Sequence, residues 1–499
     1  MLKSIILLPL IILIATSCSV SKNTYQPNKK YSPQQLKEDF RLMSKVLKAN
    51  HPSLYWYTTK DSLDAFAALV ENSITDSLTE PQFKNKLAWF VSKIHCGHTS
   101  TRPSIAFTKY YKGKQLPRFP LNIKVWKDSA VVISNLLTKD STIKRGNIIT
   151  SINQFSTQQI VDSMCSLMST DGYNNNFKLQ AFSFNFPAYF NNAFGIDSQY
   201  VVAYIDNNGK SQVDTLKNFK PMPDTGLKKT DTTVRQKAIT ETLSKKEIKI
   251  LTLLSSRNLK MDTANRTAYL AINTFSKGKL NRFFRKSFAD IKKSGVNNLV
   301  IDLRQNTGGD VMSSTKLTKY LANKPFLIAD TIASTRRGMR YKSSISGWFW
   351  YWWAMQFSTK KMADGKYHFQ YLERHHFQPK KKNHFDGNIY LITGGYTFSA
   401  ASIFTNNIKG QNNAKVVGEE TGGGSYGNSA IFIPDIVLPN TTLRVRLPLF
   451  RMVLNKDYPK NGRGIFPDEE VLPSSYLIQQ GIDGKMEQVK MLIRRQRER

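Results

Sequence analysis

The stretch "NIYLITGGYTFSAAS" runs from Asn388 to Ser402 and joins a hydrophobic run to a helical pattern through two glycines. Residues 388–393 are typical of a buried strand, and the residues after Ser399 are typical of a helix that Gly410 ends. Ser399 therefore stands at a strand-to-helix turn among small residues. A serine hydroxyl is a nucleophile near neutral pH only when a base accepts its proton. The identity of that base decides what this turn does.

A second stretch, "VIDLRQNTGGD" (Val300 to Asp310), also predicts a buried strand that runs into a glycine turn. Gly308 and Gly309 allow backbone N–H groups to face a ligand with no Cβ in the way. Such N–H groups are the usual material of an oxyanion hole. By itself the pattern also fits a tight loop between a strand and a helix.

Strands and helices alternate around these two stretches. "TAYLAINTF" (267–275) is typical of a strand, and "KLNRFFRKSFADIKKSG" (279–295) is typical of a helix that ends at a glycine. This order predicts an α/β layer in which helices connect the strands.

Four motifs in this order resemble the tail-specific, C-terminal-processing superfamily of serine peptidases. They are the DLRxNxGG and GGxTxSAA strands, "VVGEETGGG" (416–424) and "NGRGIFPDEEV" (461–471). The resemblance implies a crotonase-like or ClpP-like α/β core without a cofactor. It implies that Ser399 is the nucleophile and that the N–H of Ala400, with one from Gly308 or Gly309, forms the oxyanion hole.

The resemblance also narrows the choice of base. Where many of these proteases carry a catalytic lysine, this chain has Gly424. A second branch, similar to the core of the tricorn protease, uses a histidine from the N-terminal region, and "KIHCGHTST" (93–101) matches its signature at His98. Cys96 fills the aspartate position of that signature. We therefore expect His98 to be the base, because imidazole titrates near working pH, with His95 as the fallback.

The group that orients the base is left open by the sequence. Tricorn-like enzymes use a serine before the histidine and a distant glutamate, but Gly97 replaces that serine. The candidates here are Asn461, near the expected glutamate, and Glu420, beside the Gly-rich loop; Glu419 is adjacent. These departures leave a second hypothesis open, namely a weak or inactive enzyme that binds hydrophobic ligands or peptides. Retinoid-binding proteins of the eye share this core and do so. An acyl-group enzyme of the crotonase type is a third hypothesis, which the shared architecture alone does not exclude.

The rest of the chain divides into segments that differ in composition and in predicted secondary structure. "IKRGNIITSIN" (143–153) resembles part of a PDZ domain, with Asn147 where aspartate is usual, and such modules bind extended peptides at a sheet edge. We expect the following order: a signal peptide at 1–18, a tether at 19–31, a helical domain at 32–104, a PDZ-like domain at 105–215, a connector at 216–264, the catalytic core at 265–475 with an aromatic insertion at about 335–385, and a basic tail at 476–499.

The N-terminus resembles a bacterial lipoprotein signal. One lysine precedes an apolar stretch that is too short for a comfortable membrane span, and "ATSC" follows. Cleavage would leave Cys18 as a lipidated first residue, which places the protein on a membrane of the cell envelope, facing the periplasm or the cell surface. An ordinary secretory signal is the alternative.

Charge and cysteine content exclude several other classes. The net charge of +36 is spread along the whole chain without a nucleic-acid-binding motif, so we expect contact with anionic lipid or envelope polymers and no nucleic acid. Besides Cys18 the chain has only Cys96 and Cys165, which make no disulfide framework. No metal-ligand spacing is present.

The run Trp348 to Trp353, inside "SGWFWYWWAMQF", matches nothing in these motifs. The sequence allows a flap that grips peptide, an oligomer contact, a segment on lipid, or a helix buried on all sides. Together the patterns predict an envelope serine endopeptidase that cleaves peptides or proteins through Ser399, with His98 as general base.

Overall fold

The central feature of the fold is a six-stranded sheet that carries both glycine-turn motifs. A computed structural model describes residues 25–127, 129–140, 142–221 and 244–498. In the central sheet the strands lie in the order β10 (Arg257–Asp262), β11 (Thr267–Ile272), β12 (Asn298–Asp302), β16 (Asn388–Thr393), β17 (Ala414–Gly418) and β22 (Glu469–Glu470). Only β10 runs antiparallel to its neighbour. The predicted α/β class is confirmed.

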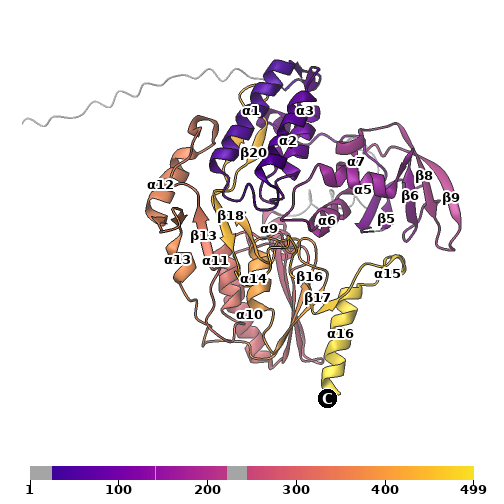
Figure 1. Cartoon of the computed structure of the whole chain (residues 1–499). Helices are drawn as coiled ribbons and strands as arrows, with labels where there is room; N and C mark the ends of the chain where they lie inside the picture. Colours follow the sequence, from indigo (N-terminus) through magenta and orange to yellow (C-terminus); the bar gives the residue numbers. More distant parts are fainter. Residues whose placement is uncertain (1–24, 128, 141, 222–243, 499) are drawn as a thin grey trace, which may run out of the picture.

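Helices cover both faces of this sheet, which explains why its inner strands read as continuous apolar runs. One face holds α10 (Leu280–Ser294), α11 (Val311–Thr318) and α14 (Ala400–Ile408), and the other holds α16 (Gly484–Arg497), as Figure 1 shows. In β12, Leu299 and Ile301 pack toward the first face, while Val300 packs toward α16. The sheet is therefore fixed between two helical layers, and the turns at its strand ends are fixed with it.

The N-terminal helices share a core with a second, antiparallel sheet. The helices are α1 (Pro33–Asn50), α2 (Lys60–Asn72) and α3 (Glu80–Ser92), and the sheet order is β14 (Lys360–Lys361), β15 (Tyr367–His368), β13 (Thr331–Ser334), β21 (Phe450–Val453) and β18 (Gly427–Ala430). Ser32 caps α1 by accepting from the Gln35 N–H. Phe40 and Phe90 belong to the same buried cluster as Phe450. This shared core holds the loop after α3 against the catalytic region.

Residues 121–217 contain a six-stranded antiparallel sheet of their own. Its strands are β4 (Leu121–Trp126), β5 (Ser129–Asn135), β6 (Ile148–Ile152), β7 (Phe155–Ser156), β8 (Gln199–Ile205) and β9 (Ser211–Lys217), and its helices are α5 (Thr157–Ser166), α6 (Asn176–Phe184) and α7 (Phe186–Phe194). Phe177 of α6 packs on Phe398, with ring centroids 4.6 Å apart, so this part reaches the Ser399 turn. Its interpretation as a PDZ-like module stays a prediction.

The smaller elements complete the fold. They are β1 (Lys30–Tyr31), β2 (Leu78–Thr79), β3 (Thr101–Arg102), α4 (Ile105–Tyr111), α9 (Lys245–Ser256), the 3₁₀ turn η1 (Lys342–Ser344), α12 (Trp348–Ser358), α13 (Gln370–Arg374), β19 (Asp435–Val437), β20 (Arg444–Arg446) and α15 (Ser475–Gln480). Strand β3 pairs with β20, directly after the loop that carries His98.

Two segments differ from the sequence expectation. Residues 257–262, expected in a connector, form β10 at the edge of the central sheet. Residues 484–497, expected in a basic tail, form α16, because Val489 and Ile493 are four positions apart and bury one helix face on the sheet.

Cys96 and Cys165 are both free thiols. Within the described residues, no helix has both the length and the apolar character that crossing a membrane requires. The predicted lipid attachment at Cys18 lies outside the described residues.

Candidate active site

Ser399 lies at the turn between β16 and α14, and its backbone is strained. Its φ of 54° and ψ of −122° form a combination that residues with a side chain rarely adopt, and such a conformation costs about 1–3 kcal/mol. Thr397 holds the turn in place. Its hydroxyl donates to the Leu303 carbonyl at 3.0 Å and accepts from the Gly394 N–H at 3.1 Å. The turn is thus fastened to the end of the neighbouring strand β12.

His98 reaches Ser399 from the loop after α3, across 301 sequence positions. Its Nε2 lies 3.1 Å from Ser399 Oγ. The imidazole is only 7% exposed, and it packs on Phe398 with ring centroids 5.0 Å apart. Burial, with a smaller contribution from Arg446, lowers the pKa of His98 to about 3. The ring is therefore neutral at physiological pH and can accept a proton.

Hydrogen bonds on both sides of His98 fix the position of its loop. Thr99 Oγ1 lies 2.8 Å from Nε2 of the buried His51, and the Thr99 N–H donates to the Cys96 carbonyl at 3.0 Å. Cys96 is itself buried, which raises the pKa of its thiol to about 11, so it is an inert part of the loop.

The double glycine of the second motif lies against the Ser399 turn. A Cβ at Gly308 would lie 2.7 Å from Ser399 Cβ and 2.9 Å from the Ala400 nitrogen. Ala400 is the first residue of α14, so its N–H has no acceptor within the helix. The Gly308 N–H already donates to Asn306 Oδ1 at 2.9 Å. Of the two glycines, only Gly309 has an N–H without an acceptor among the described residues.

Comparison with known proteins identifies this arrangement. Residues 266–471, which hold the Ser399 turn and the double glycine, match the sequence model of peptidase family S41. The chain therefore contains a peptidase S41 domain. It is a serine-type peptidase of the C-terminal-processing kind, and the predicted tail-specific superfamily is confirmed.

Solved structures of low sequence identity have a similar fold. Mature CPAF is 13% identical and superposes with a TM-score of 0.62 over 92% of this chain and 96% of its own. Mature CPAF complexed with lactacystin gives the same identity and TM-score over 92% and 98%. The photosystem II D1 C-terminal processing protease is 12% identical, with a TM-score of 0.41 over 88% and 93%. The search of curated proteins found no relative that matches this sequence.

The position that holds lysine in many S41 peptidases has no room for one here. A Cβ at Gly424 would lie 2.7 Å from the Gly427 carbonyl oxygen. The lysine close to the turn, Lys485, donates to the Thr393 carbonyl at 2.8 Å and pairs with Glu419 at 2.5 Å. The Lys485 ammonium group therefore bonds to Thr393 and Glu419, and it makes no hydrogen bond to Ser399 among the described residues.

The two candidates for the orienting group are both engaged elsewhere. Glu420 pairs with Arg463 at 2.5 Å and accepts from the Gly464 N–H at 2.6 Å, so it fastens the closing segment of the S41 domain. Asn461 is exposed and accepts from the Arg463 N–H in its own turn. The fallback base His95 lies 2.9 Å from the Gly172 carbonyl through Nδ1. None of these three residues has a contact with His98 or Ser399 among the described hydrogen bonds.

Asp171 is an acid beside the His98 loop that the sequence did not single out. Its Oδ1 accepts from the Gly97 N–H at 2.8 Å, directly before His98. The carboxyl is fully buried, which raises its pKa to about 7, although N–H groups of Gly97 and Gly424 favour the charged form. Asp171 Oδ2 and His98 Nδ1 are both buried without a partner among the described residues. In the sequence, Asp171-Gly172 signals only a turn.

Within the described residues, no group of three potential metal ligands lies together. The candidate site brings together a strained serine, a neutral histidine, two backbone N–H groups and one buried acid.

Proposed function

We propose that this S41 peptidase cleaves peptide bonds through an acyl-enzyme on Ser399, with His98 as the general base. One observation carries the proposal: Ser399 Oγ and His98 Nε2 lie 3.1 Å apart at a strained strand-to-helix turn. A nucleophile and a base within hydrogen-bonding reach are the signature of this chemistry.

The arrangement supports a complete reaction cycle. His98 Nε2 takes the Ser399 hydroxyl proton while Oγ attacks the scissile carbonyl carbon. The N–H groups of Ala400 and Gly309 then donate to the oxyanion, and each such donor is worth about 2.7–4 kcal/mol of barrier. The C–N bond breaks as His98 gives the proton to the leaving amine. Water, deprotonated by His98, hydrolyses the ester and returns Ser399 to its initial state.

We propose Asp171 as the residue that positions His98. In the reactive tautomer, Nε2 is free to accept and Nδ1 carries the hydrogen, which needs an acceptor. Asp171 Oδ2 is a buried acceptor without a partner among the described residues, and Oδ1 of the same carboxyl is bound to the residue before His98. An ionised Asp171 would also stabilise the imidazolium that forms during attack.

The proposal also covers the cellular location of the protein. Its support is the sequence alone: a short apolar segment followed by Cys18. We propose that Cys18 is lipidated and anchors the peptidase to a membrane of the bacterial envelope. Replacement of Cys18 by alanine should release the protein from the membrane fraction, and unchanged membrane retention would argue against this anchor.

A binder of hydrophobic ligands remains the second candidate. One observation favours it, because neither Asn461 nor Glu420 reaches His98. Such a binder needs no activated serine. The two candidates therefore predict different effects of replacing Ser399: a peptidase loses its cleavage of peptide bonds, whereas a binder keeps its ligand.

Digestion of an unfolded, fluorescently labelled polypeptide tests the proposal. We expect Ser399→Ala and His98→Gln each to lower the cleavage rate by roughly a millionfold, as in other serine peptidases. His95→Gln is the matched control. His95 lies three positions before His98 but binds the Gly172 carbonyl, so this variant should keep most of the activity. Equal cleavage by Ser399→Ala and wild type would rule this site out.

A further inference from the structure

Helix α12 presents a row of aromatic side chains to solvent. Trp348, Tyr351 and Met355 face inward and pack against the core of the second sheet. The opposite face is exposed, with Trp350 71%, Trp353 52% and Phe357 76% accessible. Of the alternatives that the sequence left open, a helix buried on all sides is therefore excluded. An apolar face of this kind on one short helix marks an interaction surface.

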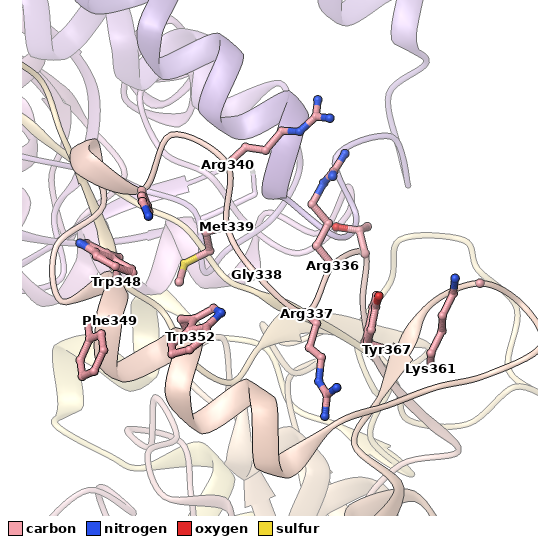
Figure 2. Close-up of a pocket in the computed structure, with 13 residues that line it drawn as sticks. Arg336, Arg337, Gly338, Met339, Arg340, Trp348, Phe349, Trp352, Lys361 and Tyr367 are labelled. Atoms are coloured by element: carbon pink, nitrogen blue, oxygen red, sulfur yellow. The ribbon is translucent and has the colours of Figure 1, made fainter.

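A basic loop lies next to this helix, and the two line an open hollow of about 820 Å³. Figure 2 shows Met339, Trp348 and Trp352 at one side of this hollow, with Arg337 and Lys361 at the other. The remaining basic residues on the lining are Arg336, Arg340 and Lys342. Aromatic and cationic groups thus share one surface, which we call the α12 surface and define as residues 336–342, 348–357 and 361.

The positive charges of the α12 surface are not neutralised by carboxylates. Within the described part of the chain, none of its five Lys and Arg side chains takes part in an ion pair. The guanidinium of Arg336 donates to the Ala49 carbonyl at 3.1 Å, and that of Arg337 donates to the carbonyls of Gln356 and Thr359. Lys342 Nζ lies 4.7 Å from the centre of the Trp348 ring. The surface therefore keeps its net positive charge.

We propose that the α12 surface docks on an anionic lipid bilayer. Tryptophan prefers the boundary between headgroups and acyl chains, and basic side chains beside it attract anionic headgroups. The exposed rings would enter this boundary, while the basic loop and the hollow would take the headgroups. A second copy of the chain fits this surface poorly, because a symmetric contact would bring the five cationic side chains of each copy together. The proposal does not depend on peptidase activity.

Quenching of tryptophan fluorescence tests this docking in the full chain with Cys18→Ala, so that no lipid on Cys18 carries the protein to the vesicle. Four of the seven tryptophans lie in α12. The chain is mixed with vesicles of brominated phosphatidylcholine, with or without phosphatidylglycerol. We expect strong quenching only when phosphatidylglycerol is present, and we expect added salt to weaken it.

Two matched triple variants separate the α12 surface from overall charge. Arg337→Gln/Arg340→Gln/Lys342→Gln should weaken docking by about 100-fold, since each basic residue contributes about a factor of five near an anionic surface. Arg282→Gln/Arg285→Gln/Lys286→Gln lowers the net charge by the same amount at three exposed positions of α10. Its tryptophan fluorescence should be quenched as strongly as that of the wild type.

A third variant, Trp350→Ala/Trp353→Ala/Phe357→Ala, should also lose docking while its cleavage of unfolded polypeptide stays unchanged. Equal loss of quenching in the α10 variant would overturn the proposal, and so would wild-type quenching on vesicles without phosphatidylglycerol. A wild-type dimer that the aromatic variant dissociates, with no quenching, would make α12 an oligomer contact instead.

Discussion

Replacement of Gly308 by alanine tests whether the double glycine builds the oxyanion hole. Gly308 has a φ of +94°, and a Cβ there would lie 2.7 Å from Ser399 Cβ, 2.8 Å from the Phe398 carbonyl oxygen and 2.9 Å from the Ala400 nitrogen. All three neighbours belong to the nucleophile turn, and two of them are backbone atoms with little freedom to move. The substitution must therefore push the Ala400 N–H and the glycine turn apart.

The size of the effect follows from this geometry. Displacement of one oxyanion donor costs about 2.7–4 kcal/mol, or a factor of 10² to 10³ in kcat. The left-handed backbone adds a separate cost of about 1–2 kcal/mol to folding. Gly410→Ala isolates that second cost, because Gly410 has a φ of +86° and no heavy atom within 4 Å of its added Cβ.

The assay is cleavage of an unfolded polypeptide, with thermal unfolding of each variant measured in parallel. We expect Gly410→Ala to be destabilised with kcat unchanged, and Gly308→Ala to be folded at 25 °C with kcat lowered by about 10² to 10³. A folded Gly308→Ala protein with the wild-type kcat would refute the assignment of the oxyanion hole.

Three further predictions follow from the surroundings of the site. Burial raises the pKa of Asp171 to about 7, while His98 stays neutral above about pH 3. The cleavage rate should therefore rise with pH through about 7, and Asp171→Asn should lack this rise. The same rise in Asp171→Asn as in the wild type would exclude the positioning role. Burial lowers the pKa of His51 to about 3 from 6.5, so the unfolded chain binds one more proton over that range and stability falls as the pH drops. His51→Asn should flatten urea-derived stability against pH by about 1.4 kcal/mol per pH unit, and an unchanged slope would contradict this. Thr397→Val removes the hydrogen bond to the Leu303 carbonyl, so it should cost about 1–3 kcal/mol of stability in the same urea titration and lower kcat; wild-type stability and activity would show that the turn holds without this bond.

The central sheet was predictable because its strands are marked by residues that are neighbours in the sequence. Strands β12 and β16 are buried on both faces and followed by glycine turns, so a continuous apolar run marks each one. Ser399 and His98 are 301 positions apart in the chain. Only the resemblance to a family predicted from the sequence that they would act together. No periodicity or composition relates residues that far apart.

The parts that sequence missed depend on tertiary contacts. Asp171 is an acid within a turn signal, and its position beside Gly97 arises only when the β-rich region packs on the His98 loop. The exposure of α12 was undecidable, because an all-aromatic run has no polar face to show which side meets water. Strand β10 alternates weakly and becomes a strand through its pairing with β11.

The most direct test of the central claim is covalent labelling of the protein by a fluorophosphonate probe, with the labelled residue mapped by mass spectrometry. We expect a single adduct on Ser399, formed far more slowly in His98→Gln and at the wild-type rate in His95→Gln. A folded wild-type protein that takes no label at Ser399, or that reacts equally fast without His98, would contradict the proposed mechanism and favour a binding protein on the S41 fold.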